Sequence, residues 1–149
     1  MDAITSLFDL DMSGFVPTMG GLTGFLKVFT FIALLIGPVL MLVFGYLYLK
    51  HPTAEANRKF GFRIFYGMGS VEAWQFTQRL AGLVFGGLGL VLTAVMLVVA
   101  IISMFQGLDT VASTFLICMI IEAALTIIAY AAVSIIVMRN FDAKGNRKR

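Results

Sequence analysis

Three long runs of apolar residues constrain what this chain can fold into more than any other feature. They extend from Val28 to Leu49, from Leu80 to Phe105 and from Val111 to Met138. Each run reaches the roughly 20 residues that are needed to cross the hydrocarbon core of a bilayer. Because lipid offers no hydrogen-bond partners to the backbone, each run is expected to be a helix. Pro38, next to Gly37, is expected to kink the first of these helices.

The composition agrees with a membrane protein. Apolar residues make up 60% of the 149 residues and charged residues only 13%, whereas soluble domains are about one quarter charged. The prediction is therefore an all-α integral membrane protein with one membrane domain, residues 1–149. The only cysteine, Cys118, lies in an apolar run, and the only histidine, His51, has no second ligand nearby. No metal site, cofactor or internal disulfide is expected.

Basic residues are distributed unevenly among the segments that flank the runs. Five lie between the first and second runs: Lys50, Arg58, Lys59, Arg63 and Arg79. Five more follow the third run: Arg139, Lys144, Arg147, Lys148 and Arg149. The remaining flanking segments contain acids and a single cation, Lys27. The positive-inside rule therefore predicts an N-terminus outside the cell and a C-terminus in the cytoplasm.

These boundaries divide the chain into seven predicted segments. They are an outer N-terminal segment, three spans with their two connections, and a basic tail: 1–26, 27–49, 50–79, 80–105, 106–110, 111–138 and 139–149. The first segment begins with acids instead of a basic region, so it is not expected to be a signal peptide. Gly14, Pro17, Gly20, Gly21 and Gly24 are expected to break this segment up, and residues 3–10 are expected to form either a short interfacial helix or a frayed tail. The basic tail is interpreted as topology charge or as a contact with anionic lipid, and nucleic acid is not an expected partner.

Small residues mark a packing face on the second span. Gly82, Gly86, Gly89 and Thr93 recur on one side of the helix. The spacing Gly82-x-x-x-Gly86 is typical of helices that approach one another closely. This face is expected either to pack within the chain or to join copies in a homo-oligomer.

The third span carries a stripe of polar residues at every fourth position. Its members are Thr114, Cys118, Glu122, Thr126, Tyr130 and Ser134. The stripe is expected to face other helices. Glu122 lies near the middle of the span, where a lone acid is costly and normally faces the protein interior or water. It predicts a site that handles protons or cations, a contact for a membrane-embedded ligand, or a protonated or hydrogen-bonded glutamate that fixes helix packing.

The connection between the first two spans is rich in polar and aromatic residues. Its core, residues 57–79, reads NRKFGFRIFYGMGSVEAWQFTQR. Ser70 is a good N-cap, so a helix is expected from about residue 71, with Glu72 in its first turn. Glu72, Gln75 and Arg79 should share one helix face, next to a face that carries Trp74 and Gln78. Arg63 is expected to reach a polar partner from the level of the headgroups.

The same connection resembles a family signature. Asn57-x-x-x-Gly61-Phe62-Arg63, Ser70-x-Glu72-Ala73-Trp74 and Gln78-Arg79-x-Ala81-Gly82 resemble the pattern of SdpI-type membrane proteins of bacteria. This family includes an immunity protein that protects a cell from its own secreted killing peptide. The spacing of Arg63 and Trp74 follows the family pattern, whereas Ile64 and Phe65 stand where the family usually has Thr and often Pro. The resemblance implies a multi-pass protein of the bacterial inner membrane.

The resemblance also implies a function. The protein is expected to bind or sense a membrane-active peptide toxin, or to signal its presence to a membrane-bound regulator. The residues that would form this binding site are Asn57, Gly61, Arg63, Ser70, Glu72, Trp74, Gln78 and Glu122. The alternative is a small proton- or cation-linked transporter subunit that uses Glu122. An enzyme is not expected, because no nucleophile–base pair, metal set or phosphate-cradling loop is recognisable.

Overall fold

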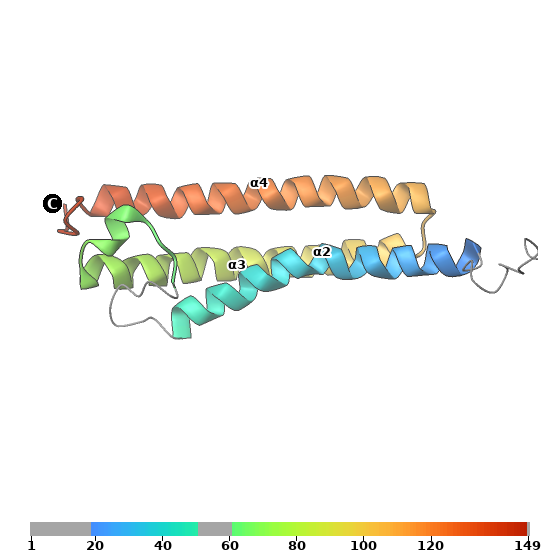
Figure 1. The fold of residues 1–149 in the computed structure, drawn as a ribbon, viewed down its shortest axis with the longest axis horizontal. Helices are drawn as coiled ribbons and strands as arrows, with labels where there is room; N and C mark the ends of the chain where they lie inside the picture. Colours follow the sequence, from blue (N-terminus) through green and yellow to red (C-terminus); the bar gives the residue numbers. More distant parts are fainter. Residues whose placement is uncertain (1–18, 51–60, 149) are drawn as a thin grey trace, which may run out of the picture.

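The computed structural model describes residues 19–50 and 61–148 of the chain. They form helix α2 (Met19–Lys50), the short 3-10 helix η2 (Phe65–Met68), helix α3 (Val71–Met104) and helix α4 (Leu108–Asn140). The three long helices lie side by side, and η2 and the C-terminus gather at one end of them (Figure 1). This end is termed the loop end, and the opposite end, where residues 105–107 join α3 to α4, is termed the hairpin end.

The predicted fold class is confirmed. Each long helix is long and apolar enough to cross a membrane, and the described residues contain only an isolated β-bridge besides helices. Large apolar side chains remain exposed along all three helices. In a bilayer these side chains contact lipid, so the fold is that of an all-α, multi-pass membrane protein.

Helix α2 begins earlier than predicted. It extends from Met19 through Gly20, Gly21 and Gly24, so the prediction that these glycines break the segment up was wrong. Gly14, Pro17 and residues 3–10 lie outside the described residues. A glycine in a helix interior costs only about 1 kcal/mol relative to alanine. A backbone group that is left without a hydrogen bond beside the hydrocarbon costs about 3 kcal/mol or more. The helix therefore continues.

The other helix boundaries follow local capping rules. Helix α3 begins at Val71 as predicted, with Ser70 as its N-cap: Ser70 Oγ accepts a hydrogen bond from the Ala73 N–H at 3.1 Å. Helix α4 begins at Leu108, three residues before the predicted start. Asp109 then lies in the first turn, where the helix dipole favours a negative charge. The connection at the hairpin end is therefore shorter than predicted.

Glycines on both helices bring the backbones of α2 and α3 into contact. A Cβ atom added to Gly45 would collide with the backbone of Gly86, and one added to Gly89 would lie 2.5 Å from the Leu42 nitrogen. A Cβ on Gly82 would lie 3.1 Å from the Gly45 carbonyl oxygen. The predicted glycine face therefore packs within the chain, against α2. Association of two copies through Gly82 and Gly86 stays a prediction.

Proline shapes the middle of α2. Pro38 lies inside the helix, and Figure 1 shows α2 bent between its two ends. Leu34, Pro38, Met41 and Gly45 are buried and form the face that packs against the other helices. Because proline supplies no N–H, the carbonyl of Leu34 loses its partner within the helix.

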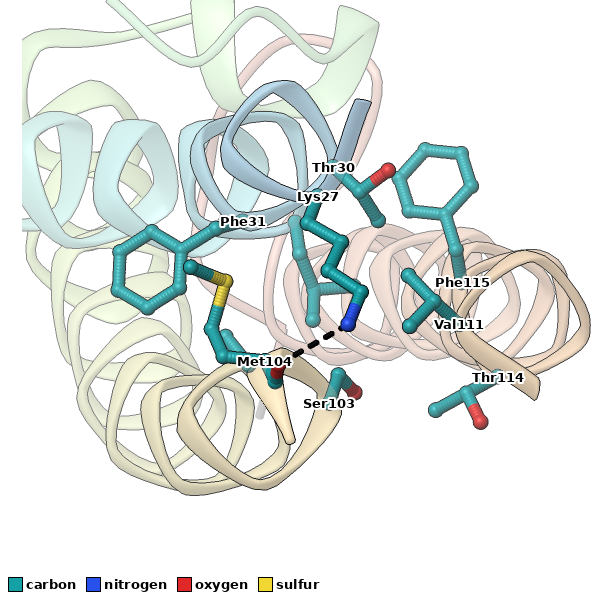
Figure 2. A pocket seen from close by; sticks show the side chains of 10 residues that line it. Lys27, Thr30, Phe31, Ser103, Met104, Val111, Thr114 and Phe115 are labelled. Carbon is teal, nitrogen blue, oxygen red and sulfur yellow. Dashed lines mark hydrogen bonds between the residues drawn. The ribbon is translucent and has the colours of Figure 1, made fainter. Parts of the chain in front are cut away.

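A lysine connects two helices at the hairpin end. Lys27 Nζ donates a hydrogen bond to the Met104 carbonyl at 3.1 Å, across the space between α2 and α3 (Figure 2). A cation at this position also interacts favourably with the C-terminal end of the α3 dipole. The cavity beside it measures about 10 Å³, which is room for about one water molecule. It is a packing gap and offers no space for a larger ligand.

Candidate functional site

Three predicted site residues come together at the loop end. The Phe62 N–H donates to Gln78 Oε1 at 2.9 Å, and Gln78 Nε2 donates to the Phe62 carbonyl at 2.9 Å. Trp74 is fully buried, and a Cβ on Gly61 would lie 2.5 Å from its ring. Gly61 also has a φ angle of +130°, so both the available space and the backbone conformation require glycine. Gly61, Phe62, Trp74 and Gln78 are termed the amide clasp.

Phe62 anchors the clasp to all three long helices. Its ring centroid lies 6.3 Å from that of Tyr48 in α2, 5.4 Å from that of Phe85 in α3 and 5.1 Å from that of Tyr130 in α4. Aromatic pairs at these distances contribute about 0.5–1.5 kcal/mol beyond their buried area. Phe62 was not among the predicted site residues. The signal that could have found it is a large aromatic residue beside a glycine in a segment of mixed polar and aromatic residues.

The C-terminal segment folds back onto the start of α3. Ser70 Oγ, which caps α3, also donates a hydrogen bond to the Gly145 carbonyl at 2.7 Å. A Cβ on Gly69 would lie 2.5 Å from the Gly145 nitrogen, and Gly145 has a φ angle of +79°. The basic tail, interpreted above as topology charge or lipid contact, is therefore also a packed part of the loop end.

Asp142 organises the turn within this tail. Its Oδ1 accepts hydrogen bonds from the backbone N–H groups of Asn146 at 2.7 Å and Lys144 at 2.9 Å. Asn146 Nδ2 donates to Oδ2 at 3.1 Å. The backbone bond from Asn146, and then its side chain, hold the pKa of Asp142 below the ordinary value of 3.8. The sequence Asp142-Ala-Lys-Gly145-Asn146 is typical of a turn, because Asp, Gly and Asn favour turn conformations.

Other side chains of the loop are exposed. Arg63, Phe65 and Met68 are termed the exposed loop face, and the Phe65 side chain is 71% exposed. Phe65 contacts Tyr66 edge-on, with 5.5 Å between the ring centroids. The polar partner predicted for Arg63 is not found within residues 19–50 and 61–148. The loop therefore presents a cation and apolar side chains on a backbone that the amide clasp holds in place.

A groove opens beside this loop, between the end of α2, the start of α3 and the tail. It has a volume of about 390 Å³ and is lined by Tyr48, Leu49, Glu72, Gln75, Phe76, Arg79, Phe141 and Arg147. Glu72, Gln75 and Arg79 all line it, which confirms that they share a helix face. Glu72 Oε1 lies 3.9 Å from an Arg147 nitrogen, and both side chains are 67% exposed. An exposed ion pair of this length contributes little to stability.

Glu122 lies away from the loop end, where α4 contacts α2. Its side chain is 7% exposed, and a Cβ on Gly37 would collide with its Oε1. Its Oε2 has no hydrogen-bond partner among the residues that the structure describes. Eight residues separate Glu122 from Tyr130, which is about 12 Å along the helix. The carboxyl group is therefore not part of the amide clasp.

The polar stripe on α4 faces the other helices only as far as Thr126, whose hydroxyl lies 3.5 Å from the Met41 sulfur on α2. Cys118 and Glu122 are buried, but Tyr130 is half exposed. The buried positions move to Ala129 and Val133 toward the loop end. A step of four residues overshoots a full helical turn by about 40°, so such a stripe leaves a straight contact face after a few steps. The prediction that the whole stripe faces other helices was wrong.

Burial separates the predicted site residues into groups. Four have internal structural contacts: Gly61, Ser70, Trp74 and Gln78. Arg63 and Glu72 are exposed, and Asn57 lies outside the described residues. Because a buried side chain cannot touch a partner, the prediction of a contact surface that includes Trp74 and Gln78 needs correction. These two residues support the loop from inside.

Comparison of the chain with protein-family models, with curated proteins and with solved structures gives no match. The likeness to SdpI-type proteins therefore stays a prediction that rests on the residues of the connection between α2 and α3.

Proposed function

We propose that this protein recognises a membrane-active peptide toxin at its loop end and acts in immunity to the toxin or in sensing it. The observation that carries this proposal is the exposed loop face, where Arg63, Phe65 and Met68 are exposed on one loop that the amide clasp fixes at Phe62. Aromatic and arginine side chains are frequent anchors of protein interfaces. A loop that is already held in place loses little conformational freedom on binding.

The location of the loop end supports a partner that is itself at the membrane. The loop end lies where the long apolar helices finish, at the depth of the lipid headgroups. On the orientation predicted from the basic residues, this end faces the cytoplasm of a bacterial cell. The partner is then a peptide that has entered the inner membrane, or a membrane-bound regulator. The resemblance of the same segment to SdpI-type proteins supports the first of these.

The exposed loop face is tested by the variant Arg63→Ala/Phe65→Ala. Its matched control, Arg139→Ala/Phe105→Ala, removes one exposed arginine and one exposed phenylalanine elsewhere. Each protein is captured from native membranes in mild detergent, and bound peptides are identified by mass spectrometry. A peptide that is retained by the wild type and the control but lost from the loop variant is the expected result. Identical peptides in all three samples would contradict the proposal.

Transport is a second candidate function, and the buried carboxyl group of Glu122 favours it. An unpartnered acid in the middle of a membrane span often belongs to a proton or cation pathway. Three helices are few for a complete pathway, so this candidate requires an oligomer. It predicts proton flux in liposomes that Glu122→Gln abolishes. Equal flux through both proteins, or none through the wild type, would exclude it.

A further inference from the structure

We propose that the groove at the loop end binds the phosphate of an anionic phospholipid from the surrounding bilayer. This inference is independent of the proposed peptide recognition, because the groove and the exposed loop face have no residue in common. Its volume of about 390 Å³ falls within the range of small-ligand sites.

One part of the groove lining is charged, and another part is apolar. Arg79 and Arg147 reach it from α3 and from the tail. Leu49 and Phe76 line it as well, and Leu49 is 42% exposed. A phospholipid has the matching character, since its charged phosphate is joined through glycerol to apolar acyl chains.

The charges in the groove favour an anion. Two guanidinium groups face a single carboxylate, Glu72, and the exposed contact between Glu72 and Arg147 is long at 3.9 Å. Arg79 has no ion pair or hydrogen bond to any residue of the described ranges. A guanidinium group donates two parallel hydrogen bonds to phosphate oxygens, which makes arginine a strong phosphate ligand. The other charged residues described at this end are five cations and one acid: Lys50, Arg63, Arg139, Lys144, Lys148 and Asp142.

The position of the groove along the helices favours a lipid over free phosphate as its ligand. Leu49 belongs to the last turn of α2, and the groove lies where the apolar part of that helix ends. One turn further into the membrane, Phe44 on α2 and Leu83 on α3 are exposed apolar side chains. Phe44 lies four residues before Tyr48, and Leu83 lies four residues after Arg79. Each of them therefore shares a helix face with a residue that lines the groove. Acyl chains would cover them while the headgroup occupies the groove.

The proposal is tested by lipid binding to the full-length protein. Purified protein in mild detergent is mixed with equal amounts of phosphatidylglycerol and phosphatidylcholine, and bound lipids are measured by native mass spectrometry. The groove variant is Arg79→Gln/Arg147→Gln, and the matched control Arg139→Gln/Lys144→Gln removes two cations outside the groove. The wild type and the control should prefer phosphatidylglycerol by about thirtyfold, since the two basic contacts contribute about 1 kcal/mol each. The groove variant should lose this preference.

Further variants sharpen the test. Glu72→Gln removes the only carboxylate among the described residues that line the groove and should increase the preference for phosphatidylglycerol about threefold. If the glutamine pair does not fold, Arg79→Lys/Arg147→Lys keeps the charge but removes the paired hydrogen bonds, and it should lower the binding of phosphatidylglycerol about threefold.

Four results would overturn the proposal. The first is the same lipid preference in the groove variant and the control, and the second is unchanged binding of phosphatidylglycerol by the lysine variant. The third is displacement of phosphatidylglycerol by millimolar inorganic phosphate, which would identify a free-phosphate site. The fourth is a groove variant that keeps its lipid preference but no longer captures a peptide, which would make the groove a peptide site. The exposed loop face variant should retain its lipid preference, so the two proposals can fail separately.

Discussion

The α2–α3 crossing and the loop end hold the same helices together in different ways. At the crossing, Gly45 and Gly86 have no side chains, and their backbones meet directly. At the loop end, the Phe62 ring fills the space between three helices, and Gln78 fixes the loop with two buried hydrogen bonds.

The difference follows from the surroundings of each region. Within the hydrocarbon, burial of apolar side chains gives no advantage over lipid contact, so helices associate where small residues allow close packing. At the headgroup level, water competes for polar groups, and a loop needs buried hydrogen bonds and an apolar anchor to stay fixed. The stability of the crossing should therefore decrease when a substitution adds volume. The stability of the loop end should decrease when a required glycine or a buried hydrogen-bond partner is lost.

The largest effect is expected for Gly45→Ala. The added Cβ would collide with the backbone of Gly86, which cannot move aside as a side chain can. The helices must separate, at a cost of about 2–3 kcal/mol. Thermal unfolding in detergent, followed by circular dichroism, should show a clear decrease in melting temperature. Gly87→Ala is the control, since its Cβ would meet no atom within 4 Å. Equal melting temperatures of the two variants would contradict this account of the crossing.

Gly61→Ala tests the loop end. The φ angle of +130° and the nearby Trp74 ring both disfavour a Cβ, and we expect a local cost of about 1–3 kcal/mol. The helices should remain, but Trp74, the only tryptophan, should become solvated and its fluorescence should shift to longer wavelength. Gly107→Ala, at a position with open space, should leave the emission unchanged. A variant with wild-type emission would show that the clasp does not depend on glycine.

A smaller effect is expected where α4 contacts α2. Gly37→Ala should destabilise the protein by about 1–2 kcal/mol, because its Cβ would collide with the Glu122 carboxyl group. In a Glu122→Ala background the same substitution should cost much less. The coupling in this double-mutant cycle should reach about 1 kcal/mol. Additive costs would mean that the two residues do not interact.

The smallest effect concerns the tail turn and depends on pH. Since hydrogen bonds from Asn146 hold the pKa of Asp142 below 3.8, the charged carboxylate is the form that stabilises the turn. This stabilisation is fully present above the ordinary pKa and is lost as the pH falls through the lower, folded value. The NMR shift of the Asn146 amide should follow this titration. Asp142→Asn should give a flat profile, and a wild-type midpoint above 3.8 would contradict the assignment.

Much of this protein could be predicted from short stretches of sequence. The three spans follow from the length of apolar runs, since a helix in lipid satisfies its own backbone. The start of α3 follows from Ser70, because an N-cap acts on the next three residues. The shared face of Glu72, Gln75 and Arg79 follows from helical periodicity alone.

Only the tertiary structure decided which of the predicted site residues are exposed. Trp74 and Gln78 resembled contact residues in sequence, yet the fold buries them under Gly61 and Phe62. The bond from Ser70 to Gly145 joins residues 75 positions apart. Such contacts depend on where whole helices end and how they cross, and no local pattern specifies this. The sequence alone determined the spans and their helix faces, because these depend on neighbouring residues. The groove exists only because packing brings α2, α3 and the tail together.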